Sequence, residues 1–200
     1  MKISLIIALA GSREAVIGGD KRCITFSGSC PQLEDELYSG RIKNDQELLA
    51  RAAELSATLQ ITDEREKVWR IGDLLVGEVT ELSSLLERRR RIYLAPGASL
   101  EVDITGREAR IRARGGVGCV VFGNRFTREL AGSCATRAGG RVNEDIIKSI
   151  FVEAGDRTAS VSRQHMILKS DKKPSDPNGA LQKALEEDCQ KSGWRLCDPQ

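Results

Sequence analysis

The sequence predicts an α+β fold in which two β-sheets are stacked between layers of helices. Strand-like segments occupy residues 3–20 and recur at 160–170, while helical segments lie between them at 32–57, 125–137 and 142–156. A sheet buries its apolar face against another layer, so this order predicts a four-layer αββα sandwich. Two hundred residues with 40% hydrophobic content fit one domain with a substantial core.

The first half of the chain reads as strands interrupted by a helical insertion at about residues 31–63. Before it, "CITFSG" continues the extended pattern and ends in turn-forming residues. Within it, "KNDQELLARAAEL" carries the clearest helical pattern, because Leu and Ala recur at helical spacing. Strand character returns in "KVWRIGDLLVGEVT", with a turn at Gly72 and Asp73.

More strands are expected between residues 88 and 122. "RRRRIYLAP" and "SLEVDITGREARIRARG" are joined by a turn at Pro96 and Gly97. The four arginines of Arg88–Arg91 predict an exposed strand edge guarded by charge. The apolar run "GVGCVVFGN" predicts a strand covered on both faces, with Cys119 as a small core residue.

The last third predicts two helices, "RFTRELAGSCATR" and "VNEDIIKSIFVEAGD", followed by the strand "SVSRQHMILKS". His165 lies in that strand beside apolar residues, which favours a packing role. The main domain is therefore expected to span residues 1–170. Residues 171–200 are expected to form a polar linker and a C-terminal helix or tail.

The opening "MKISLIIALAGSREAVIGGD" permits two interpretations. One is a secretory signal peptide cleaved after Ala10, and the other is a buried strand, a turn at "GSRE" and a second strand ending at Asp20. The single basic residue and the continuing strand pattern favour the second interpretation. We therefore expect a cytoplasmic protein with reduced cysteines.

Composition excludes several other classes of function. The formal net charge is only +2, which predicts no nucleic-acid partner. No apolar run is long enough to cross a bilayer, so no stable membrane insertion is expected. Six scattered cysteines and one histidine show no zinc-ligand spacing, so neither a metal nor a cofactor is expected.

Three segments carry a resemblance to proteasome β subunits. "SLIIALAGSREAVIGGDKR" resembles their opening, where an aspartate follows a nucleophilic hydroxyl residue, and Ser4 and Asp20 match that spacing. "EKVWRIGDLLVG" resembles the strand that begins at the active-site lysine, which implies this role for Lys67. "FGNRF" and "DRTASVSRQHMIL" resemble a glycine turn and a late serine-bearing loop, which implies supporting roles for Asn124 and Ser160.

The order of these segments and the insertion make the chain similar to the connectases, an archaeal proteasome-like family of N-terminal nucleophile hydrolases associated with methanogens. "ELYSG", "LVGEV", "FGNRFT" and "TASVS" carry this similarity, which runs from Ser4 to about Ser170. It implies a sequence-specific protein ligase, or transpeptidase, that attacks a Lys-Asp-Pro-Gly-Ala motif between Asp and Pro. One fragment would be held covalently and passed to a chain beginning with proline. The implied partner is the A subunit of the methanogen methyltransferase complex.

The implied chemistry requires an activated serine. A hydroxyl is a poor nucleophile without a base, and the α-amine of an N-terminal Ser4, with a reference pKa of roughly 7.7–8.0, would serve as one. Lys67, oriented by Asp20, would favour the alkoxide. Arg22 is a candidate substrate-binding residue or a source of positive field, with a solvated strand edge as the alternative. An ordinary ion pair, or no contact, is the alternative for Asp20 and Lys67.

The start of the chain departs from the family pattern. Members usually begin Met-Thr, whereas Met1-Lys2-Ile3 precedes Ser4 here. Exposing the serine therefore requires removal of Met1–Ile3, for example by self-cleavage through an N-to-O acyl shift. Other functions stay open: an N-terminal nucleophile amidohydrolase or peptidase, in which water takes the acyl group, and a catalytically silent proteasome-like protein that binds a partner. A secreted binding protein would instead have oxidised cysteines and begin at Gly11.

Overall fold

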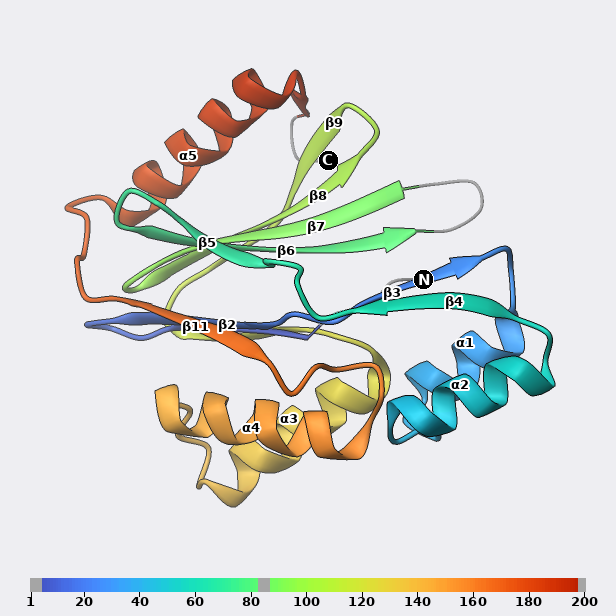
Figure 1. Cartoon of the computed structure of the whole chain (residues 1–200). Helices are drawn as coiled ribbons and strands as arrows, with labels where there is room; N and C mark the ends of the chain where they lie inside the picture. Colours follow the sequence, from blue (N-terminus) through green and yellow to red (C-terminus); the bar gives the residue numbers. More distant parts are fainter. Residues whose placement is uncertain (1–4, 83–86, 198–200) are drawn as a thin grey trace.

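The chain folds into four layers, with two β-sheets stacked between helices (Figure 1). The computed structural model describes residues 5–82 and 87–197. One helix covers the outer face of a six-stranded sheet, and a pair of helices covers the outer face of a four-stranded sheet. A smaller lobe projects from one side. The predicted αββα architecture is therefore confirmed.

The four-stranded sheet joins strands from both ends of the main fold. Its strands are β1 (Ile6–Ala10), β2 (Ala15–Asp20), β10 (Gly118–Phe122) and β11 (His165–Ser170). They run antiparallel in the order β10-β1-β2-β11. The inner strand β1 is almost wholly buried, so the strand interpretation of the opening residues is confirmed.

β10 is an edge strand and is not covered on both faces as the sequence pattern predicted. Among the described strands it pairs with β1 alone. Its first residues are exposed, and Cys119 with them, so the expected core position of Cys119 is wrong. The error arises because only the second half of the strand, ending at the buried Phe122, packs into the core.

The six-stranded sheet is built from a meander and one late strand. Its strands are β5 (Val68–Ile71), β6 (Leu74–Leu82), β7 (Glu87–Ala95), β8 (Ala98–Thr105), β9 (Glu108–Gly115) and β12 (Arg195–Cys197). Their order is β12-β9-β8-β7-β6-β5, and β12 is parallel to β9. The predicted turns at Gly72 and Gly97, and the turn at Gly106 between β8 and β9, all have a glycine with positive φ, which glycine adopts readily.

Arg88–Arg91 do not form an exposed edge, because β7 is an inner strand between β6 and β8. Arg91 is only 8% exposed and binds both Glu78 and Asp188 through its guanidinium, at 2.6 Å in each case. The guanidinium also lies 5.2 Å from the ring centre of Trp69 and 4.9 Å from that of Trp194. The expectation of a charge-guarded edge is therefore wrong, and Arg91 is part of the packing between sheet and helix.

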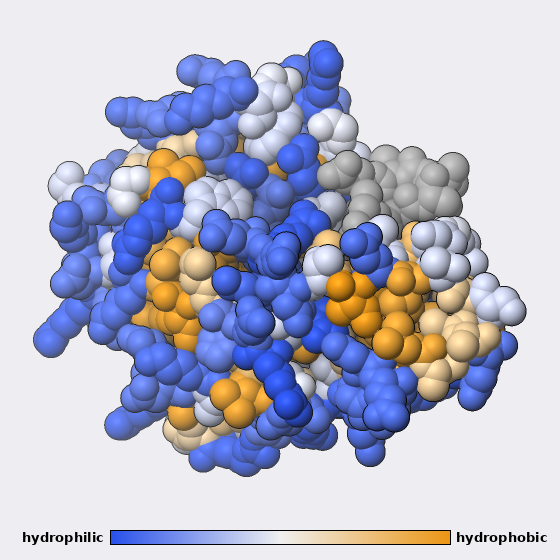
Figure 2. Space-filling model, in the orientation of Figure 1, coloured by the Kyte–Doolittle hydropathy of each residue, from blue (hydrophilic) through white to orange (hydrophobic). Residues whose placement is uncertain are grey.

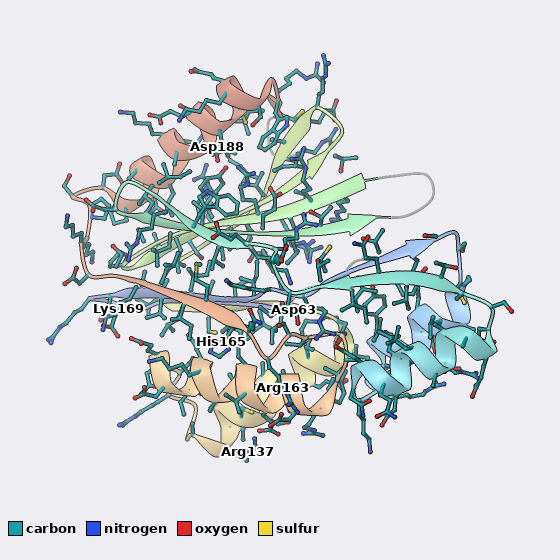
Figure 3. All side chains as sticks on the ribbon, viewed as in Figure 1. Asp63, Arg137, Arg163, His165, Lys169 and Asp188 are labelled. Carbon is teal, nitrogen blue, oxygen red and sulfur yellow. The ribbon has the colours of Figure 1, made fainter. Side chains whose placement is uncertain are left out.

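α5 (Pro177–Ser192) is the outer helix that covers this sheet (Figure 1). It is the helix expected near the C-terminus, and it buries Leu181, Ala184, Leu185 and Cys189 against β7 and β8. Asp188 points from α5 toward the sheet (Figure 3), where it binds Arg91 and accepts a hydrogen bond from the Tyr93 hydroxyl at 2.7 Å. Burial raises the pKa of that hydroxyl. The helix is thus held by both apolar contacts and charge.

α3 (Arg125–Arg137) and α4 (Glu144–Arg157) cover the four-stranded sheet (Figure 1). Each begins at an asparagine whose side chain accepts a backbone N–H of the first turn, a favourable N-cap. The His165 ring stacks on Phe151 of α4 with ring centres 5.1 Å apart, which agrees with its expected packing role. None of the described helices is long and apolar enough to cross a membrane.

The projecting lobe contains the segment predicted as a helical insertion at about residues 31–63, together with a strand that precedes it. It contains β3 (Cys23–Ser27), α1 (Pro31–Tyr38), α2 (Asp45–Glu54) and β4 (Thr58–Thr62). β3 and β4 pair with each other, and Leu33, Leu37 and Leu48 are buried beneath them. Arg51 binds Glu36 with two hydrogen bonds of 2.7 and 2.8 Å, which lower the pKa of Glu36 to about 2 and join the two helices.

Candidate active site

A buried ion pair lies where β2 ends beside the start of β5. Asp20 is the last residue of β2 and is fully buried, and Lys67, just before β5, is 2% exposed. Lys67 Nζ donates to Asp20 Oδ1 at 2.8 Å and to Arg22 O at 2.7 Å. The alternative in which Asp20 and Lys67 do not meet is therefore excluded.

The surroundings of the pair compensate for its loss of water. Burial lowers the pKa of Lys67, and the Asp20 carboxylate opposes this effect by favouring the ammonium form. Asp20 Oδ1 also accepts a hydrogen bond from the backbone N–H of Leu5. Asp20 Oδ2 accepts hydrogen bonds from the backbone N–H groups of Arg22 at 2.8 Å and Ser162 at 3.3 Å. Each carboxylate oxygen thus has two donors, as a buried charge requires.

Leu5, the first described residue, is fixed directly to this pair. Its N–H donates to Asp20 Oδ1 at 2.8 Å, and its carbonyl accepts Asp20 N at 3.2 Å. Ser4, the predicted nucleophile, lies outside the described residues. Its peptide bond is to the same Leu5 nitrogen that donates to Asp20.

Arg22 connects the pair to the lobe and is not a solvated strand edge. It is 8% exposed, and its guanidinium binds Asp63 through Nε at 2.7 Å and also binds Asp45. Its Nη1 donates to the carbonyl of Ala159 at 3.1 Å. These carboxylates raise the pKa of Arg22 although burial alone would lower it. Asp63 lies at the junction of lobe and sheets (Figure 3).

Asn124 and Ser160, both predicted supporting residues, meet each other. Asn124 Nδ2 donates to Ser160 Oγ at 3.2 Å, while its Oδ1 caps α3 by accepting Thr127 N at 2.8 Å. Ser160 Oγ lies 2.9 Å from the Thr158 hydroxyl. All three side chains are buried, with exposed fractions of 4% or less.

The loop that follows α4 links the Asp20–Lys67 pair to the hydrogen-bonded side chains of Asn124 and Ser160. Ser160 is hydrogen-bonded to Asn124, the Ala159 carbonyl accepts Arg22, and the Ser162 amide donates to Asp20. This loop thus joins fixed hydroxyl and amide groups to the Asp20–Lys67 pair, which binds the Leu5 amide. A buried cation and carboxylate in such a network are suited to activating a nucleophile. Among the described residues, no group of three or more His, Cys, Asp or Glu side chains is placed to hold a metal ion.

Residues 3–190 match the family model described as Connectase MJ0548-like, N-terminal domain. The chain belongs to the connectase family. The resemblance noted in the sequence is therefore confirmed over nearly the whole chain.

Comparison with other proteins gives more distant likenesses. No curated protein sequence matches this connectase-family chain. It is similar to the structure of Thiobacillus denitrificans BPH in complex with epoxomicin, with 10% identity and a TM-score of 0.47 over 85% of this chain and 100% of the other. It is also similar to an Anbu (Gly-1) mutant from Hyphomicrobium sp. strain MC1, with 9% identity and a TM-score of 0.44 over 94% of this chain and 96% of the other.

Several groups at the site of this connectase-family chain were missed by sequence reasoning. The Leu5 and Ser162 amides bind Asp20 through backbone atoms, which carry no residue-specific signal. Asp45 and Asp63 bind Arg22 from positions 23 and 41 residues away. Asp63 directly follows the last residue of β4, and charged residues at strand ends are the only signal that could have drawn attention to it.

Replacing the buried cap Asn124 should cost more stability than replacing an exposed one. Asn124→Ala removes both the α3 cap and the hydrogen bond to Ser160, so we expect a loss of about 2–3 kcal/mol in the free energy of unfolding. Asn143→Ala removes an exposed cap of α4 and should cost about 1 kcal/mol. Urea denaturation measures both, and equal losses would show that the link to Ser160 contributes nothing.

Proposed function

We propose that the protein is a connectase-like protein ligase, or transpeptidase, whose nucleophile is Ser4 after removal of Met1–Ile3. The observation that carries the proposal is the buried pair of Asp20 and Lys67, hydrogen-bonded to the Leu5 amide. Its two ionised groups sit beside the one peptide nitrogen to which Ser4 is attached. An ion pair with only a structural role could lie anywhere in the core, whereas activation of Ser4 requires charged groups close to residue 4.

The hydrogen bonds of Lys67 support this role. An ammonium group has three donors, and within the described residues two of them go to Asp20 and the Arg22 carbonyl. The third donor is available to the Ser4 hydroxyl. A buried cation there favours the alkoxide form, so the serine becomes a better nucleophile at neutral pH.

The reaction then follows from the α-amine of Ser4 acting as base. Ser4 Oγ attacks the Asp carbonyl of the substrate Asp-Pro bond, its proton passes to the α-amine, and an ester forms as the C–N bond breaks. The departing proline nitrogen takes the proton back. Ligation is the reverse, with the N-terminal proline of a second chain attacking the ester. Asn124 and Ser160 keep the loop after α4 in place.

The substrate and setting belong to the same proposal. The substrate is a protein with a Lys-Asp-Pro-Gly-Ala motif, and the methanogen methyltransferase A subunit is the proposed natural one. The protein acts in the cytoplasm of an archaeal cell, without a cofactor. Family membership supports these assignments.

Intact mass and a labelling assay test the proposal. Loss of the mass of Met1–Ile3 is expected, followed by a mass increase when the protein is incubated with a Lys-Asp-Pro-Gly-Ala peptide. Ser4→Ala should abolish the acylated species, while Ser12→Ala, in the turn after β1, should leave it unchanged. A processed protein that hydrolyses the peptide without ligating it would identify an amidohydrolase. A protein that is never processed or acylated in its native host would overturn the proposal.

A further inference from the structure

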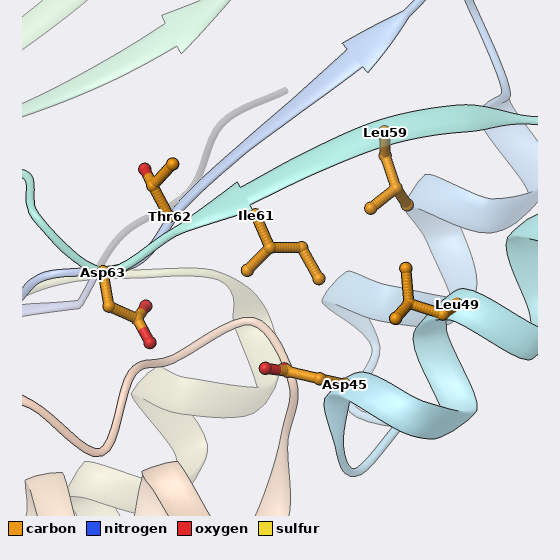
Figure 4. Close-up of a pocket in the computed structure, with 6 residues that line it drawn as sticks. All are labelled: Asp45, Leu49, Leu59, Ile61, Thr62 and Asp63. Carbon is orange, nitrogen blue, oxygen red and sulfur yellow. The ribbon is translucent and has the colours of Figure 1, made fainter.

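An open pocket with apolar and acidic lining residues lies on the lobe between α2 and β4. It has a volume of about 400 Å³ and is lined by Asp45, Leu49, Leu59, Ile61, Thr62 and Asp63 (Figure 4). Leu49 of α2 is 54% exposed, whereas its neighbour Leu48 is buried in the core of the lobe. Hydrophobic side chains gather on this face of the lobe, at the right of the view in Figure 2.

β4 forms one wall of the pocket and has an open edge. Among the described strands it pairs only with β3. Leu59 and Ile61 are two residues apart, so both project from the same face of the strand toward α2 (Figure 4). A strand with a free edge and apolar side chains on one face is a template for an extended peptide, which pairs its backbone and buries alternate side chains.

The pocket leads to the candidate active site. Asp45 and Asp63 stand at its end, and both bind Arg22. The Arg22 amide donates to Asp20, and its carbonyl accepts Lys67. The pocket is therefore joined to the Asp20–Lys67 pair through Arg22.

We propose that the free edge of β4 binds an extended segment of the substrate protein, with aliphatic side chains at alternate positions entering the pocket of Leu49, Leu59 and Ile61. This inference rests on the proposed function, since it makes the lobe the site that holds the substrate beside Ser4. Its occupant is a stretch flanking the cleaved bond. Because Arg22 joins the pocket to the Asp20–Lys67 pair, a segment bound in the pocket would lie close to the reacting serine.

Equilibrium binding to the Ser4→Ala protein tests the inference without turnover. The probes are fluorescent peptides that carry the Lys-Asp-Pro-Gly-Ala motif and a six-residue extension, placed either before or after the motif. The extension alternates either Val and Thr or Gly and Ser, and fluorescence anisotropy measures binding. One Val-Thr peptide should bind about tenfold more tightly than its Gly-Ser counterpart. Leu49→Gln should remove this difference, while Val152→Gln, which changes a residue of α4 that is 56% exposed, should not.

Strand pairing is tested with N-methylated peptides. The tighter peptide is methylated on alternate backbone nitrogens in two complementary sets. An added strand points alternate N–H groups at its neighbour, so one set should abolish the Val-Thr advantage and the other should not. Equal effects of both sets, or of the Leu49 and Val152 variants, would overturn the inference. If the peptides bind as expected but the protein that retains Ser4 is not acylated by them, only the proposed function is overturned.

Discussion

Lys67→Met is expected to lower the free energy of unfolding by about 3–5 kcal/mol and to slow acylation at least ~100-fold. The substitution keeps an unbranched side chain of similar length but leaves the Asp20 carboxylate buried without a cation. An unpaired buried charge is costly, because it has lost its water and gained no compensating partner. The loss of rate follows from removing the cation that shares Asp20 Oδ1 with the Leu5 amide. Urea denaturation and single-turnover acylation measure the two effects.

The matched control is Lys169→Met. Lys169 forms an ion pair with Glu14 at 2.6 Å, but the two side chains are 47% and 39% exposed. An exposed pair contributes about 0–1 kcal/mol, so this variant should differ little from the parent in either measurement. If Lys67→Met were as stable and as active as Lys169→Met, the pair with Asp20 would be neither a structural nor a functional requirement.

Arg22→Met should loosen the lobe while leaving the sheets intact. It removes the bonds to Asp45, Asp63 and the buried Ala159 carbonyl, so we expect local opening to become easier by about 2–3 kcal/mol. Amide hydrogen exchange in α2 and β4 should then speed up by roughly 30- to 150-fold, with β1 unchanged. Hydrogen exchange measured by mass spectrometry resolves these segments.

Arg137→Met is the control for this measurement. Arg137 is 62% exposed and binds Glu153 on the helical layer, away from the lobe. Its replacement should leave exchange in α2 and β4 at the parental rate. Uniform acceleration through the whole chain in Arg22→Met would instead show that the lobe and the sheets unfold as one unit.

The sequence predicted the layered fold because each element carries its own local pattern. The helices of the lobe and of the outer layers appear as Leu and Ala at helical spacing, and the turns at Gly72 and Gly97 are marked by glycine. The order of strands in a sheet has no such local signature. For that reason the sequence predicts an edge position for Arg88–Arg91, although their strand lies between two others and Arg91 packs against Trp69 and Trp194.

The candidate site was predictable only where spacing matched a known family. Asp20 and Lys67 are 47 residues apart, and no periodic pattern joins them. Their contact depends on the stacking of two sheets, and the Leu5 and Ser162 amides reach Asp20 through the path of the backbone. Such donors do not depend on side-chain identity, so residue types could not reveal them.

The pairing of the first strand has a consequence for the order of events during synthesis. β1 and β2 leave the ribosome early, but their partners β10 and β11 begin at residues 118 and 165. Contacts this distant in the chain form late and slow the folding reaction. The Ser162 amide that completes the bonding of Asp20 is made later still than β10. A nascent chain therefore carries β1 and β2 before the bonding of Asp20 is finished, so this charge network is complete only once most of the polypeptide exists.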